Sequence, residues 1–129
     1  MTNNRCHNYL PIWLIFGRYD LDVDYKTAKL KKLCLASKEA DKKLGPNSGK
    51  KLRTRLADIE AASNVSELIT GRPHPYTGDK AGLFSLDLHG GDRLLFEPLK
   101  KKPPTKDDGG IDWSNVESIY VVFIGDPHE

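Results

Sequence analysis

The hydrophobic pattern of the chain changes from the period of a helix to that of a strand at the proline- and glycine-rich stretch GRPHPYTGDKAG (residues 71–82). Before this stretch, from Thr27 to Ile59, apolar residues recur every three or four positions, which is the spacing of an amphipathic helix. After it, three runs have the composition or the period of two that is typical of strands: residues 83–88, 93–97 and 118–125. A chain with helices followed by strands is predicted to be an α+β protein, in which both kinds of element pack around one core.

The helical region is expected to hold two helices. Apolar residues at helical spacing predict the first helix over residues 27–44. The pair Gly45-Pro46 should end it, because glycine accepts the left-handed cap conformation and proline cannot continue a helix. Asn47 or Ser48 can cap the second helix. Its apolar stripe consists of Leu52, Leu56 and Ile59. The short turn between the helices predicts an antiparallel helical hairpin.

The strands are expected to form a small, mainly antiparallel sheet. Leu21, Val23 and Tyr25 alternate with aspartates, so a half-buried strand precedes the helices. The sequence HGG (residues 89–91) predicts a turn that joins the two runs beside it into a hairpin. The run SIYVVFIG (residues 118–125) is apolar enough for a central strand. The predicted order is β-α-α-β-β-β, with the helical hairpin on one face of the sheet.

Length and composition limit the chain to one domain of ordinary size. It has 129 residues, of which 38% are hydrophobic and 29% are charged. We expect the domain to span residues 21–129. Residues 1–20 are then an N-terminal extension, either an extra strand or the result of a start codon assigned too far upstream. The polar stretch over residues 100–108 is expected to be a mobile surface loop.

The cysteines and the apolar runs indicate the compartment. Cys6 and Cys34 are far apart and have no metal-ligand spacing. Cys34 lies in an apolar helical pattern, which favours a buried free thiol over a disulfide. The run LPIWLIF (residues 10–16) is shorter than the roughly 20 residues that cross a bilayer. We therefore expect a cytoplasmic protein without a membrane partner.

Charge is distributed unevenly along the chain. Residues 26–55 hold eleven Lys or Arg and two acidic residues, a net charge of +9, whereas residues 56–129 hold seven basic and thirteen acidic residues, a net charge of −6. This polarity predicts a basic face for phosphates or for an acidic partner. The alternative is that lysines merely solvate the outer faces of the helices. The candidate RNA-binding residues are Lys50, Lys51, Arg53 and Arg55.

Two stretches, HPYTGDKAGLFSLDLHGGDRLLFEP and DGGIDWSNVESIYVVFIGDPHE, carry a resemblance to a known family. Together they resemble toxins of the RelE/ParE superfamily, in particular the HigB-like branch. In that branch a His-Pro-Leu-Lys-Gly-Asp-Arg loop enters the hairpin and Asp-Tyr-His closes the last strand. The resemblance extends over about residues 21–129 and includes the order of the elements.

The resemblance implies a function and partners. It implies the toxin of a type II toxin–antitoxin pair that cuts messenger RNA on the ribosome without a metal or other cofactor. The expected partners are the ribosome, the message and a small HigA-like antitoxin with a helix-turn-helix. The alternatives are a toxin-fold protein that binds its antitoxin but cuts nothing, and a ParE-like gyrase poison, since fold alone does not decide activity.

Metal-free cleavage of RNA needs particular side chains. The ribose 2′-hydroxyl must lose a proton, the phosphorane charge must be stabilised, and the leaving 5′-oxygen must gain a proton. Histidine can do either proton step near neutral pH, and Arg or Lys can hold the phosphate. The candidate catalytic residues are His74, Lys80, Arg93 and His128. A simpler role for Arg93 is to pair with Asp87 across the hairpin.

Three positions depart from the family pattern. The lysine of the entry loop is replaced by Tyr76-Thr77, an arginine of the first hairpin strand by Asp87, and the tyrosine of the terminal motif by Pro127. The first two changes reduce the positive charge of the expected site. The third removes an aromatic hydroxyl that could stack on a base or assist proton transfer. These departures weaken the expected catalysis but leave the expected fold unchanged.

Overall fold

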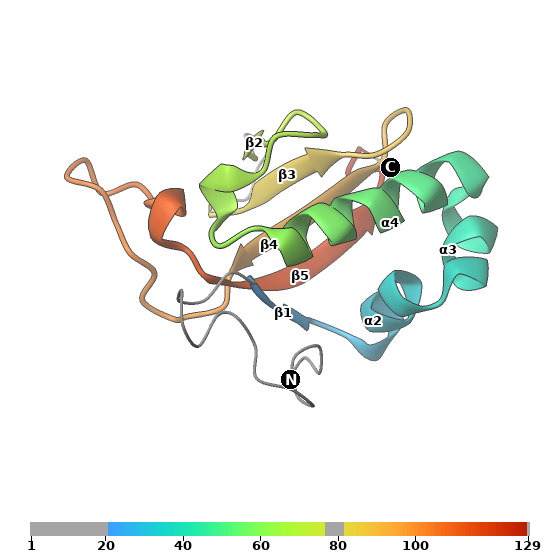
Figure 1. The fold of residues 1–129 in the computed structure, drawn as a ribbon, viewed down its shortest axis with the longest axis horizontal. Coiled ribbons are helices and arrows are strands. Elements are labelled where there is room, and N and C mark those ends of the chain that lie inside the picture. Colours follow the sequence, from blue (N-terminus) through green and yellow to red (C-terminus); the bar gives the residue numbers. More distant parts are fainter. Residues whose placement is uncertain (1–20, 77–81, 129) are drawn as a thin grey trace.

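The computed structural model describes residues 21–76 and 82–128, and this part of the chain forms three α-helices and five strands (Figure 1). The elements are β1 (Asp22–Tyr25), α2 (Ala28–Leu35), α3 (Ser37–Leu44), α4 (Pro46–Ala61), β2 (His74–Pro75), β3 (Phe84–Asp87), β4 (Arg93–Pro98) and β5 (Ser118–Gly125). Two 3-10 turns, η1 (Val65–Glu67) and η2 (Trp113–Asn115), precede β2 and β5. The predicted N-terminal extension, Thr77 and Lys80 lie outside the described residues.

The strands form one mixed sheet in the order β1-β5-β4-β3-β2. β1 pairs with β5 in parallel, and the other neighbours are antiparallel. The predicted α+β class and the mainly antiparallel sheet are therefore confirmed. β2 was not predicted: the sequence places His74 in a loop, whereas the structure pairs His74 with Ser85 at the edge of the sheet.

The prediction of one helix over residues 27–44 is wrong, because the helix breaks at Ala36. Ala36 is extended, its N–H donates to the Lys32 carbonyl, and its own carbonyl accepts from Glu39 and Ala40. Its backbone therefore closes α2 and opens α3. Thr27 caps α2, since its Oγ1 accepts from the Leu30 N–H at 3.1 Å. Neither glycine nor proline marks this break in the sequence.

The predicted caps of the second helix are also wrong. α4 begins at Pro46, with Gly45 as its N-cap at φ 89°. Proline is favoured in the first turn of a helix because the missing N–H would have no helical partner there. Ser48 instead reaches the β3–β4 turn, where its hydroxyl donates to Asp92 Oδ2 at 2.6 Å and accepts from the His89 N–H at 3.2 Å. This contact anchors the start of α4 to the hairpin.

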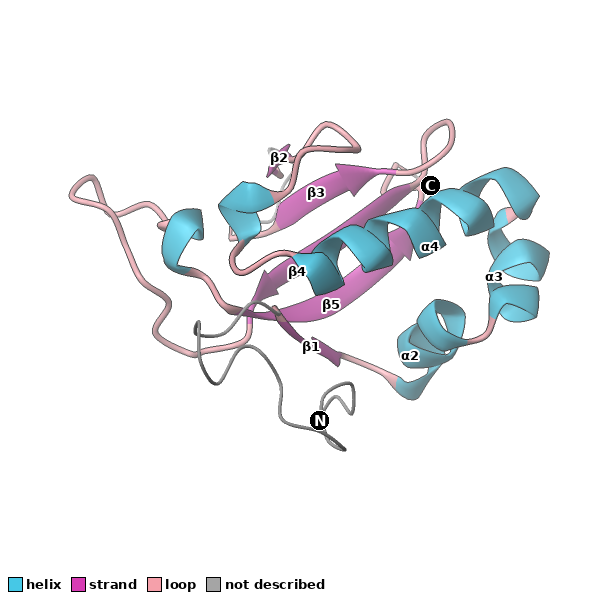
Figure 2. Cartoon of the chain, viewed as in Figure 1, coloured by secondary structure: helices cyan, strands magenta, loops and turns pink. Residues whose placement is uncertain are grey.

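The core lies between the helices and one face of the sheet, and α4 runs across that face (Figure 2). Buried helical residues meet strand residues there: Leu33, Ala40, Leu52 and Ile59 pack with Phe84, Leu86, Leu94, Phe96, Ile119, Val121 and Ile124. The predicted stripe of α4 is confirmed, as Leu56 also packs against this core. Cys34 is a partly buried free thiol, and burial raises its pKa to about 12, so it stays protonated near neutral pH.

The other side of the sheet, named here the outer face, carries Ser85, Asp87, Arg93, Leu95 and Phe123. Side chains of a strand alternate between faces, and cross-strand partners share a face. Ser85 pairs with Leu95, Leu95 with Phe123, and Asp87 with Arg93. These residues are absent from the core cluster that their strand neighbours form.

The long connection before β5 is not a featureless loop. Thr105 and Ile111 form an isolated β-bridge, and the Trp113 ring lies 4.8 Å from that of Phe84. The segment over residues 100–108 is largely exposed, as expected. Within the part of the chain that the structure describes, no helix has both the length and the apolar character to cross a membrane.

Candidate functional site

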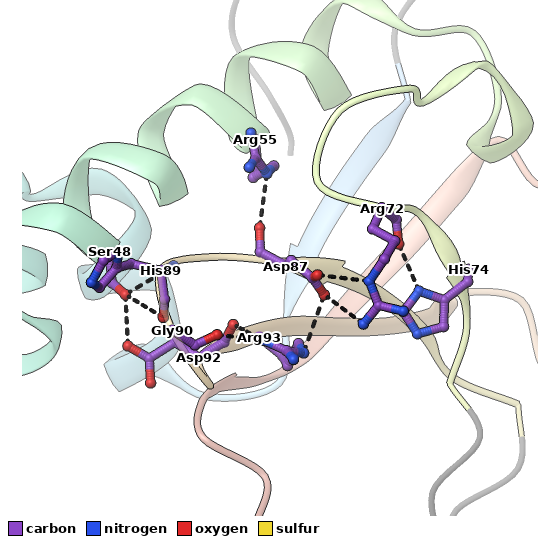
Figure 3. Close-up of polar contacts among 9 residues, drawn as sticks. All are labelled: Ser48, Arg55, Arg72, His74, Asp87, His89, Gly90, Asp92 and Arg93. Atoms are coloured by element: carbon purple, nitrogen blue, oxygen red, sulfur yellow. Dashed lines mark hydrogen bonds and ion pairs between the residues drawn. The ribbon is translucent and has the colours of Figure 1, made fainter.

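Three arginines from different parts of the chain converge on Asp87, at the end of β3 (Figure 3). Arg55 of α4 donates from Nε to the Asp87 carbonyl oxygen at 2.9 Å. Arg72 donates from Nε to Oδ2 at 2.9 Å, and Arg93 Nε lies 3.1 Å from Oδ1. Two guanidinium groups therefore hold one carboxylate from two sides.

Local backbone structure brings Arg72 to this position. Gly71 and Arg72 have φ values of 87° and 50°, both in the left-handed region that favours glycine. The Gly71 carbonyl accepts from the Asp87 N–H at 2.7 Å, so the loop is bonded to the end of β3. A Cβ on Gly71 would overlap the Arg55 side chain, which passes directly over it. The glycine therefore permits both the turn and the approach of Arg55.

Arg93 is held more tightly than Arg72. Its Nη1 donates to the carbonyl oxygens of Gly90 at 3.0 Å and Asp92 at 2.9 Å, in addition to the ion pair with Asp87. The side chain of Arg93 is 22% exposed and that of Arg72 is 65% exposed. The structure thus contains the Arg93–Asp87 pair that the sequence offered as the simpler role, and it leaves Arg72 as the more accessible cation.

His74 lies beside this cluster. Its Nδ1 is 2.6 Å from the Arg72 carbonyl oxygen, which can only accept, so Nδ1 carries the proton. In the neutral ring Nε2 then has a free lone pair and can accept a proton. The register partner of His74 is Ser85, which is 1% exposed, and its Oγ is the one buried side-chain polar atom without a hydrogen-bond partner among the described residues.

The structure does not bring all the predicted catalytic residues together. Arg93 pairs with Asp87 directly, whereas His74 contacts the cluster only through the carbonyl oxygen of Arg72. His128 is exposed and follows β5, whose last residue, Gly125, is the register partner of Arg93. The chain therefore places His128 at the same end of the sheet as Arg93. Lys80 lies outside the described residues.

The four predicted RNA-binding residues differ in accessibility. Lys50 and Lys51 are exposed on α4, and Arg53 pairs with Asp41 at 3.1 Å. Arg55 is only 7% exposed and points to β3, so the structure does not place it on the exposed basic surface. The reason is helical geometry, since Arg55 lies on the same side of α4 as the buried Leu52 and Ile59.

Sequence reasoning missed Arg72. The position of the Arg72 side chain depends on a left-handed backbone conformation. This conformation is uncommon in residues other than glycine, so the sequence gives no indication of it. A basic residue two positions before the candidate His74 was the available signal. Among the described residues, no group of three His, Cys, Asp or Glu side chains is arranged to hold a metal ion.

Comparison with known proteins does not assign the chain to a family. No protein-family model matches it, and no curated protein matches it at a significant level.

Proposed function

We propose that this protein is the toxin of a type II toxin–antitoxin pair, of the HigB-like branch of the RelE/ParE superfamily, and that it cuts messenger RNA on the ribosome. The observation that carries the proposal is the Arg72–Asp87–Arg93 cluster beside His74. Guanidinium groups bind phosphate in the same planar, two-pronged manner as they bind carboxylate. Two arginines that already hold one anionic group can therefore hold the scissile phosphate.

The proposed reaction is attack by the ribose 2′-hydroxyl on the adjacent phosphorus. His74 Nε2 accepts the 2′-hydroxyl proton while the new bond between the 2′-oxygen and phosphorus forms. Arg72 and Arg93 stabilise the negative charge of the phosphorane. The bond from phosphorus to the 5′-oxygen breaks, and His128 donates a proton to that oxygen. The products are a 2′,3′-cyclic phosphate and a 5′-hydroxyl, with no change in oxidation state.

The proposed partners follow from the charge distribution. The exposed lysines of α2, α3 and α4 provide a surface for ribosomal RNA or for an acidic segment of a helix-turn-helix antitoxin. Lys50 and Lys51 are the α4 residues of this surface.

One observation favours a second candidate, a toxin-fold protein that binds its antitoxin without cutting RNA. The Asp87 carboxylate forms ion pairs with both Arg72 and Arg93, and residue 127 is proline where the family has tyrosine. A substrate phosphate must therefore compete with an internal carboxylate for Arg72 and Arg93.

The experiment is controlled expression of the wild type and of His74→Ala, Arg93→Ala and His89→Ala, with growth and message integrity as readouts. His89 is the matched control, because it is an exposed turn histidine that bonds to Ser48 through its backbone. We expect Arg93→Ala to slow cleavage about 100- to 1000-fold. His74→Ala should slow it at least about 100-fold, and His89→Ala should cleave like the wild type.

Other outcomes select the alternatives. Full cleavage by both His74→Ala and Arg93→Ala would place the chemistry outside this cluster. Growth arrest with intact messages and damaged DNA would indicate a gyrase poison. Normal growth and intact messages with the wild type would indicate the binding protein.

A further inference from the structure

Phe123, the sixth of the eight residues of β5, is the one residue of this strand that is exposed. It is 36% exposed on the outer face, whereas Ile119, Val121 and Ile124 of the same strand are buried in the core. The pairing register between β4 and β5 shifts at Leu95/Phe96. Because this shift interrupts the regular alternation of side chains between the two faces, Phe123 lies opposite Leu95 on the face turned away from the helices.

The Phe123 ring extends along the outer face toward the arginine cluster. Its Cζ and Cε2 atoms lie 3.6 and 3.8 Å from the position that a Cβ of Gly125 would occupy. Gly125, with φ 140°, is the register partner of Arg93, and the two strands are about 4.8 Å apart. The ring therefore lies one strand away from Arg93, which is bonded to Asp87.

A flat apolar ring beside phosphate-binding cations is the arrangement with which proteins hold single-stranded nucleic acid. The cations bind the backbone, and the aromatic ring stacks on a base. Binding of phosphate and ribose does not require an aromatic ring. A single exposed aromatic residue without neighbouring cations is a common feature of protein surfaces and would not indicate a binding site. The two features occur together here on one face of the sheet.

We propose that Phe123 stacks on a base of single-stranded RNA, next to the phosphate held by Arg72 and Arg93. This inference rests on the proposed nuclease function and specifies how its substrate is positioned. Phenylalanine has no hydrogen-bonding group, so the contact accepts any base and favours purines, which have the larger ring.

The alternative is that Phe123 only covers Gly125 and Leu95. The test compares Phe123→Leu, which keeps an apolar cover but cannot stack, with Phe123→Trp, which can. Leu99→Ala is the control, because Leu99 is 41% exposed outside the sheet. The probe is a short single-stranded RNA with 2′-O-methyl groups, which cannot be cut by 2′-hydroxyl attack, and a matched set in which each nucleotide in turn is abasic.

We expect Phe123→Leu to bind the intact RNA about 5- to 150-fold more weakly, which is the range for loss of one stacked base. Phe123→Trp and Leu99→Ala should bind like the wild type. One abasic position should weaken binding to the wild type but not to Phe123→Leu, a coupling that a purely structural role would not produce.

Equal affinities of the wild type and Phe123→Leu, together with equal rates of message cleavage on ribosomes, would overturn the stacking proposal and leave the nuclease function intact. Failure of the nuclease function is seen separately, as intact messages after expression of the wild type.

Discussion

At the scale of single residues, the Asp87 carboxylate forms ion pairs with both Arg72 and Arg93. In the proposed nuclease, a substrate phosphate would have to compete with this carboxylate for both arginines. We expect Asp87→Asn to strengthen binding of single-stranded RNA, because the change removes a negative charge from between two guanidinium groups. The exposed Arg72 pair adds little stability, but Arg93 and Asp87 are mostly buried, so weakening their ion pair should lower the free energy of unfolding by roughly 1 to 3 kcal/mol.

RNA affinity and urea unfolding of the same preparation check both expectations. Asp112→Asn is a suitable control, since Asp112 caps η2 and is outside the sheet. Weaker RNA binding by Asp87→Asn would mean that Asp87 orients the arginines for the substrate instead of competing with it.

At the scale of elements, the loop at Gly71 and Arg72 is held in place by a hydrogen bond from the Asp87 N–H of β3 to the Gly71 carbonyl oxygen. Arg55 of α4 donates to the Asp87 carbonyl oxygen at the same position. Gly71→Ala should destabilise the protein and disrupt the cluster, because the new Cβ overlaps the Arg55 side chain. Gly109→Ala is the matched control: Gly109 has φ 89°, close to the 87° of Gly71, but open space around it. Both changes cause a similar backbone strain of about 1 kcal/mol, so the additional loss for Gly71→Ala measures the overlap.

Thermal unfolding of the two variants gives this difference, and a Gly71→Ala protein that is no less stable than Gly109→Ala would contradict the described packing. RNA binding should fall only with Gly71→Ala, since Gly109 is far along the sequence in the connection before β5.

Strands with a clear composition could be predicted, whereas features set by the backbone could not. The range 118–125 was predicted for β5 and observed as Ser118–Gly125, because β-branched and aromatic residues favour the strand conformation. The break at Ala36 depends only on backbone hydrogen bonds, and β2 is too short for a periodic pattern. For the candidate site, residue type alone could single out His74 and Arg93, whose catalytic roles stay a prediction, whereas the position of Arg72 and the burial of Arg55 depend on the fold.

At the scale of the whole molecule, the separation of charge predicts how binding depends on salt. Lys43, Lys50 and Lys51 are exposed on α3 and α4, and Lys100, Lys101 and Lys102 are exposed on the connection after β4. Changing either set of three to glutamine removes the same charge. If the helical surface contacts phosphates, only the first set should flatten the salt dependence, by up to about 2 in the slope of log K against log salt for single strands.

Binding of single-stranded RNA titrated over a range of salt concentrations gives the two slopes. Equal slopes for the two triple variants would show that the helical lysines serve only as a solvated surface.

The chemistry of the message ends after brief expression of the wild type tests the proposed RNA cleavage most directly. We expect new ends that carry a 5′-hydroxyl, in phase with the reading frame, opposite fragments with a 2′,3′-cyclic phosphate. These ends should be lost in Arg93→Ala. Cleavage that leaves 5′-phosphate ends, or 5′-hydroxyl ends that persist at the wild-type rate in Arg93→Ala, would contradict RNA cleavage by the outer face of this sheet.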